Sequence, residues 1–170
     1  SVRKGTKKAL LVVDMPKGSY NNLKVAKKNA KIVFNKTKCD AIKIESNGKN
    51  YKIIKGLVKS GYNVMGHIGF TPQFFNKFKI KGTNEKETKN LITEAKRIED
   101  AGAFSIVLEC IKTNVSKIIT KKLDIPTIGI GSSKFCVGQV LVTEDLIGLS
   151  GFHPRFVKKY LNMKSIIDKG

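Results

Sequence analysis

The sequence predicts an α/β fold and, within that class, a (β/α)8 TIM barrel. Six short apolar runs alternate with amphipathic helical stretches along the 170 residues, the order of parallel strands joined by helical crossovers. Nearly every run also ends in a polar residue or glycine. A doubly wound sheet concentrates its functional residues at one switch point, whereas a barrel takes them from many strand ends around one mouth. The strand ends therefore favour the barrel over the doubly wound alternative.

Each apolar run is short and rich in Ile, Val and Leu, as buried strands of a parallel sheet are. In chain order the expected strands cover residues 9–16, 41–46, 63–69, 104–110, 125–131 and 139–145. A complete barrel has eight strands and typically about 250 residues. We therefore expect residues 1–170 to form a single, partial barrel domain that is a piece of something longer.

Five helices are expected from apolar residues at helical spacing. Their apolar faces are Leu23, Ala26, Ala30 and Val33; Ile54, Leu57 and Val58; Leu91, Ala95 and Ile98; Val115, Ile118 and Ile119; and Phe156, Val157, Tyr160 and Leu161 after Pro154. The third helix should begin at Asn84, because Glu87 three residues later gives a capping-box spacing, and should end by Gly102.

The strand expected over residues 41–46, AIKIES, carries charges that a buried parallel strand should not have. Ile42 and Ile44 alternate with Lys43 and Glu45, and successive side chains of a strand point to opposite faces. The isoleucines can therefore face the helices while the charged pair faces the interior of the barrel. We predict that Lys43 and Glu45 belong to a site at the barrel mouth.

Three carboxylates, Asp14, Glu45 and Glu109, stand at the ends of three different strands. Each alone could cap the next helix or face solvent, but several acids at one rim favour a site. Mg²⁺ is bound by a few oxygens and keeps waters or substrate oxygens in its shell. Lys43 shares the face of Glu45 and can reach an anionic ligand of the same ion.

Two further residues are candidates for reactive groups. His67 in GHIG could hydrogen-bond a substrate oxyanion or be a structural histidine. Cys110 directly follows Glu109, so in a strand the two side chains face opposite sides. We expect Cys110 to be a buried, inert thiol rather than a nucleophile.

Composition narrows the partners and the location. The formal net charge is +20, yet only three of 33 basic residues are arginine, and the lysines are spread through every expected helix. Such a charge is typical of a solvated surface, so we expect no nucleic-acid partner. Three cysteines without CxxC spacing suggest neither a disulfide framework nor a zinc site. Without an apolar run of about 18 residues or a signal-peptide core, we expect a cytoplasmic protein and no membrane partner.

Beyond these patterns, the sequence resembles the ketopantoate hydroxymethyltransferase (3-methyl-2-oxobutanoate hydroxymethyltransferase) family. The resemblance covers essentially the whole chain and is carried, in the family's order, by LLVVDMPKGSY, AIKIE, VMGHIGFTPQ, AGAFSIVLEC, IPTIGIG and GQVLVTEDLIG. It implies a barrel of the phosphoenolpyruvate/pyruvate superfamily type with strands three to eight present. The first two strands, including an Asp-Ser pair that supplies a metal ligand and a substrate contact, would precede Ser1.

The resemblance also implies a reaction: Mg²⁺-dependent transfer of a hydroxymethyl group from 5,10-methylenetetrahydrofolate to 3-methyl-2-oxobutanoate, giving 2-dehydropantoate. It assigns Asp14 and Glu45 as metal ligands and Glu109 as the general base. Asp14, Lys43 and His67 would contact the substrate. The family is typically a large homo-oligomer, a decamer, so the same assembly is expected here.

Some positions depart from the family pattern, and two other functions stay open. Lys17, residues 46–48 and Val137 differ from the usual residues, although none carries an assigned chemical role. The chain could instead belong to another metal-dependent oxoacid enzyme of the same superfamily, such as a relative of phosphoenolpyruvate mutase or isocitrate lyase. The alternative of another class is a basic module that binds polyanions.

Overall fold

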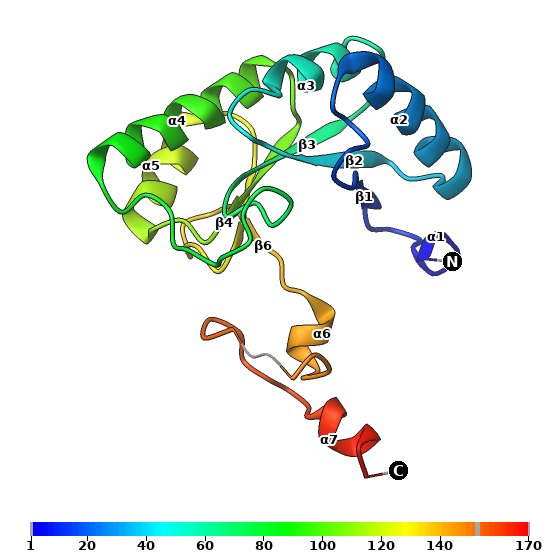
Figure 1. Cartoon of the computed structure of the whole chain (residues 1–170), viewed down its shortest axis with the longest axis vertical. Helices are drawn as coiled ribbons and strands as arrows, with labels where there is room; N and C mark the ends of the chain where they lie inside the picture. Colours follow the sequence, from blue (N-terminus) through cyan, green and yellow to red (C-terminus); the bar gives the residue numbers. More distant parts are fainter. Residues whose placement is uncertain (1, 152–153, 170) are drawn as a thin grey trace.

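The computed structural model describes residues 2–151 and 154–169, and a parallel sheet forms its centre (Figure 1). Within these residues the strands are β1 (Val12–Asp14), β2 (Ala41–Glu45), β3 (Val64–Gly69), β4 (Ser105–Glu109), β5 (Thr127–Ile130) and β6 (Gly138–Gln139). They lie side by side in chain order, and every neighbouring pair is parallel. A doubly wound sheet would reverse its order at a switch point. The fold is therefore part of a (β/α)8 barrel, as predicted.

Four longer helices connect successive strands and cover one side of the sheet (Figure 1). They are α2 (Leu23–Thr37), α3 (Tyr51–Val58), α4 (Glu85–Asp100) and α5 (Thr113–Lys122), and the short helices are α1 (Val2–Gly5), α6 (Thr143–Leu146) and α7 (Met163–Ile167). Since the long helices take one side of the sheet, its other side is left as the barrel interior. Among the described residues, no helix is both long and apolar enough to span a membrane.

The main apolar core lies between this sheet and its helices. Ile42 and Ile44 are fully buried in it, together with Ile54 of α3 and Ile98 of α4. Burying apolar surface in this layer is the main force that holds the helices on the sheet. The prediction from the alternation in AIKIE is therefore confirmed for the isoleucines, because they face the helices.

Helix α4 begins where the sequence predicts, although its cap differs in detail from a capping box. Asn84 accepts a hydrogen bond from the Glu87 backbone N–H (2.9 Å). The Glu87 carboxylate, however, accepts from the N–H groups of Gly82 (2.8 Å) and Thr83 (2.9 Å), which precede the cap. The helix ends at Asp100, two residues before Gly102. Asn84 thus satisfies one otherwise unpaired donor of the first turn, while Glu87 fixes the loop that leads into the helix.

The strand predicted over residues 139–145 is wrong beyond its first residue. Only Gly138 and Gln139 pair in register with β5. The Val140 N–H donates once more to the Gly129 carbonyl (3.0 Å), and α6 begins at Thr143. Among the described residues no further strand pairs with the other edge of β6, so the apolar run that follows has no ladder to join. Glu144 and Asp145 instead lie in the first turn of α6, where carboxylates interact favourably with the helix dipole.

The helix predicted over residues 156–161 is also wrong. That segment is not helical, and α7 forms later, over Met163–Ile167. Val157 is buried, but Tyr160 and Leu161 remain 68% and 50% exposed. This part of the chain extends away from the sheet in Figure 1. A short amphipathic helix needs a surface for its whole apolar face, and among the described residues Tyr160 and Leu161 lack one.

Candidate active site

The residues predicted from the strand ends converge on the inner face of the sheet. The strand register places Asp14 beside Lys43 and Glu45 beside His67. It also pairs His67 with the β4 residue two positions before Glu109. Register partners in a parallel sheet share a face, as do residues two apart along one strand. All five side chains therefore lie on the face opposite the helices, although their chemical roles stay predictions.

A buried histidine connects the basic and acidic parts of this face. His67 is only 1% exposed. Its Nδ1 lies 3.4 Å from the Lys43 ammonium, which also lies 3.1 Å from Asp14 Oδ1. Because an ammonium group can only donate, Nδ1 accepts in this contact, which leaves the ring N–H on Nε2.

The Nε2 atom of His67 faces the carboxylate predicted to be the general base. It lies 3.0 Å from Glu109 Oε2. This contact is close but not aligned as a hydrogen bond, and Nε2 makes no other hydrogen bond among the described residues. A buried N–H is rarely left unpaired. His67 is therefore able both to hold Glu109 in place and to donate to an oxygen that enters the site.

Glu45 is held as a buried carboxylate beside the histidine. Its side chain is 8% exposed, and Oε1 lies 3.9 Å from His67 Nδ1. Oε2 accepts a hydrogen bond from the Gln73 backbone N–H (2.9 Å). Burial raises the pKa of Glu45, and the Gln73 N–H and the nearby His67 and Lys43 only partly oppose that rise. A nearby cation would favour the ionised form of this carboxylate.

Gln73, which received no role from the sequence, connects three parts of the site. Its Nε2 donates to the Met15 carbonyl (3.0 Å), and its Oε1 accepts from the Tyr20 hydroxyl (2.6 Å). Burial raises the pKa of Tyr20, so this hydroxyl stays protonated and can donate. The side chain of Gln73 thereby fixes the loop whose backbone N–H binds Glu45. The only signal in the sequence was its place in GFTPQ, next to the third strand.

The carboxylates of Asp14 and Glu45 suit a magnesium ion in type and position. They lie on adjacent strands and on the same face, and the Asp14 side chain is 61% exposed and open to further ligands. In the part of the chain that the structure describes, no three or more His, Cys, Asp or Glu side chains are grouped to hold a metal. Mg²⁺ commonly takes one or two carboxylates and completes its shell with water and substrate oxygens. The two residues therefore fit a part of such a shell.

Burial makes Cys110 poorly suited to act as a nucleophile. It is 1% exposed, and burial, followed by the neighbouring Glu109 charge, raises the pKa of its thiol to about 12. A nucleophilic cysteine has to be a thiolate. The prediction of a buried thiol is confirmed, and its inertness stays a prediction.

Comparison with known proteins finds relatives over nearly the whole chain. The sequence pattern of the family described as ketopantoate hydroxymethyltransferase matches residues 1–170. The chain is 53% identical over 168 residues to 3-methyl-2-oxobutanoate hydroxymethyltransferase of Pelagibacter ubique, covering 99% of the chain and 65% of the relative. It is 48% identical over 174 residues to the enzyme of that name from Clostridium kluyveri, covering 99% of the chain and 62% of the relative. The chain thus spans slightly less than two thirds of the length of these relatives.

Solved structures show a similar fold at low sequence identity. A protein assigned as a phosphonomutase from Burkholderia cenocepacia has a TM-score of 0.56 at 11% identity, with 72% of this chain and 54% of that chain covered. The carboxyl transferase domain of Rhizobium etli pyruvate carboxylase has a TM-score of 0.52 at 17% identity, with 75% and 24% covered. These likenesses concern the fold alone. The sequence matches, together with the strand order, show that this chain belongs to the ketopantoate hydroxymethyltransferase family.

Proposed function

We propose that the protein containing this chain transfers a hydroxymethyl group from 5,10-methylenetetrahydrofolate to 3-methyl-2-oxobutanoate, giving 2-dehydropantoate. The observation that carries the proposal is the series of contacts from Asp14 through Lys43 and His67 to Glu109 on the inner face. These contacts place the Lys43 ammonium, which can bind an acidic substrate, on the same face as the Glu109 carboxylate, which can act as a base. The relatives that bear the name of this transferase support the same reaction.

In this reaction Asp14 and Glu45 would hold Mg²⁺. When bound, the ion supplies Lewis-acid polarisation of the keto group of the substrate. The Lys43 ammonium, which is largely buried between Asp14 and His67, binds the substrate carboxylate. A charge-assisted contact of this kind is stronger than one between neutral groups.

Glu109 is the proposed general base. It removes the proton at C3 of the oxoacid. One water adds its oxygen to the one-carbon unit and gives its two protons to N5 and N10 as both carbon–nitrogen bonds break, so that tetrahydrofolate leaves. The carbanion left at C3 forms the carbon–carbon bond to the released carbon, and the proton held by Glu109 passes to its oxygen to complete the hydroxymethyl group. His67 Nε2 lies 3.0 Å from Glu109 Oε2 and borders the proposed base on one side. The same N–H is placed to stabilise an oxygen on which negative charge develops.

Cytoplasmic location and homo-oligomeric assembly remain predictions from the sequence.

The test is Glu109→Gln in the full-length protein that contains this chain, compared with Glu85→Gln as a matched control. Glu85 is exposed at the start of α4. We expect Glu109→Gln to lower kcat for Mg²⁺-dependent 2-dehydropantoate formation by about 10²–10⁴-fold, the usual contribution of general-base catalysis. The control should stay near wild type. Full activity in Glu109→Gln would refute the proposed role.

A further inference from the structure

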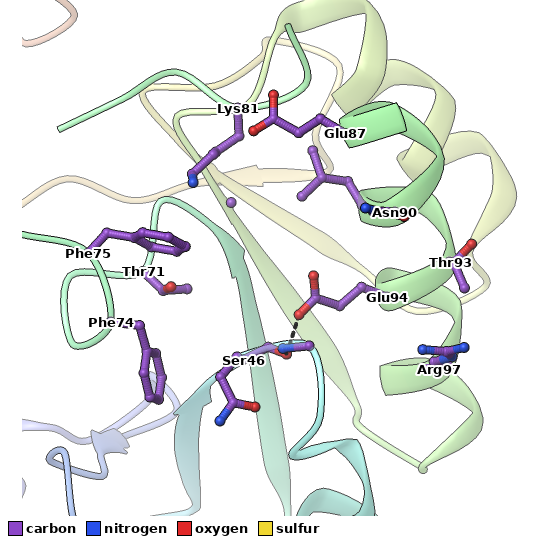
Figure 2. A pocket seen from close by; sticks show the side chains of 14 residues that line it. Ser46, Thr71, Phe74, Phe75, Lys81, Glu87, Asn90, Thr93, Glu94 and Arg97 are labelled. Atoms are coloured by element: carbon purple, nitrogen blue, oxygen red, sulfur yellow. Dashed lines mark hydrogen bonds between the residues drawn. The ribbon is translucent and has the colours of Figure 1, made fainter. Parts of the chain in front are cut away.

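The proposed reaction needs two substrates, and the inner face accounts for only the smaller, acidic one. A hollow of about 510 Å³ lies between the loop of residues 70–81 and helix α4 (Figure 2). Pockets of 300–1,000 Å³ are the usual size for small-molecule sites. None of the five inner-face residues lines this hollow. It is therefore a separate space, large enough for a flat ring system.

The hollow adjoins the candidate active site through two residues. Ser46 and Gly69 both line it. Ser46 directly follows Glu45, and Gly69 is the register partner of Glu109. A ligand bound in the hollow would therefore lie beside the ends of the strands that carry the base and a proposed metal ligand.

One wall of the hollow is aromatic and contains an unpaired hydroxyl. The rings of Phe74 and Phe75 line the loop side, and Lys81 Nζ lies 3.6 Å from the centroid of the Phe75 ring. Thr71 is 1% exposed, and its Oγ1 has no hydrogen-bond partner among the described residues. Figure 2 shows Thr71 on the loop side, facing the space in front of α4. Because buried hydroxyls are nearly always paired, this one is available to pair with a group that enters the hollow.

The opposite wall offers a carboxylate. Glu94 of α4 accepts a hydrogen bond from the Ser46 hydroxyl through Oε1, while its Oε2 has no partner in the described part of the chain. Figure 2 shows the carboxylate directed from the helix into the hollow. A carboxylate fixed in this way accepts from the adjacent N–H groups of a 2-amino-pyrimidinone edge, because both donors point in one direction.

From these walls we propose that the hollow binds the pteridine ring of the folate co-substrate. The ring packs against Phe74 and Phe75, its 2-amino and N3 hydrogens donate to Glu94, and a ring heteroatom pairs with the Thr71 hydroxyl. Stacking of a flat ring on aromatic side chains contributes both affinity and orientation. The identity of the ligand rests on the proposed function, whereas the contacts follow from the geometry of the hollow.

The test measures binding separately from turnover. Titration calorimetry on the full-length protein gives Kd for tetrahydrofolate and, separately, for 3-methyl-2-oxobutanoate. For Glu94→Gln we expect Kd for tetrahydrofolate to rise about 10- to 100-fold, the effect of losing a hydrogen bond to a charged acceptor, with the oxoacid Kd unchanged. Thr71→Val, which keeps the volume and removes the hydroxyl, should weaken the same ligand only. Glu85→Gln on the same helix is the control.

The possible results separate this inference from the proposed function. If wild-type protein forms 2-dehydropantoate while Glu94→Gln and Thr71→Val bind tetrahydrofolate normally, the pteridine site is wrong and the function stands. If both variants weaken the two substrates equally, the site is also refuted, because the damage is then general. If wild type forms no product but the variants lose tetrahydrofolate selectively, the site stands and the proposed reaction fails.

Discussion

Gly69 joins the stability of the sheet to the position of the proposed base, so adding one methyl group there should affect both. It is the last residue of β3 and has φ of 98°, a conformation that residues with a side chain rarely adopt. A Cβ at this position would lie 2.1 Å from the carbonyl oxygen of Glu109 and 2.7 Å from Ile111 Cγ1. The same carbonyl accepts a hydrogen bond from the Phe70 N–H (2.8 Å). Gly69→Ala therefore has to displace the backbone of Glu109.

The loss of stability expected for Gly69→Ala has two parts, which a matched variant can separate. The positive φ costs an alanine about 1–2 kcal/mol. Relieving the close approach adds about 1–3 kcal/mol, the usual cost of overpacking. Gly61 has φ of 84°, but a Cβ there would meet nothing within 4 Å. Gly61→Ala should therefore carry only the conformational part of the cost.

Urea unfolding followed by circular dichroism measures both variants in the full-length protein. We expect Gly69→Ala to lower the free energy of unfolding by about 2–5 kcal/mol and Gly61→Ala by about 1–2 kcal/mol. Only Gly69→Ala should also reduce 2-dehydropantoate formation, since only it moves Glu109. Equal destabilisation by the two variants would show that the close approach to Glu109 does not constrain this position.

Two further predictions concern buried titratable groups. Burial gives Glu45 a raised pKa, so the folded state binds its proton more tightly, and stability falls as pH rises from the ordinary glutamate value through the raised one. In metal-free protein, Glu45→Gln should make the urea midpoint of unfolding depend less steeply on pH. An unchanged dependence of the midpoint on pH would contradict the raised pKa. Cys110, with a pKa near 12, should react with iodoacetamide at pH 8 only after unfolding, as judged by mass spectrometry; rapid labelling of folded protein would contradict its burial.

Local periodicity was enough to predict the order of elements from β1 to β5. Strands and helices in that region follow from side-chain spacings of two and about 3.6 residues, and each apolar face has a neighbour to cover it. The inward direction of Lys43 and Glu45 was also predictable, because alternation along β2 is a local property. The same reasoning failed over residues 139–145 and 156–161, where strand or helix formation depends on a complete partner surface, which the described residues provide only in part.

The barrel class, the strand ends and the set of five polar residues on one face therefore follow from local patterns in the chain. Which of these residues touch depends on the folded molecule, because register and loop packing join residues far apart in the chain. The Gln73 N–H reaches Glu45 across 28 positions, and the Ser46 hydroxyl reaches Glu94 across 48. Neither contact leaves a periodic signal in the sequence. The unpaired hydroxyl of Thr71 likewise became visible only when the loop was packed beside α4.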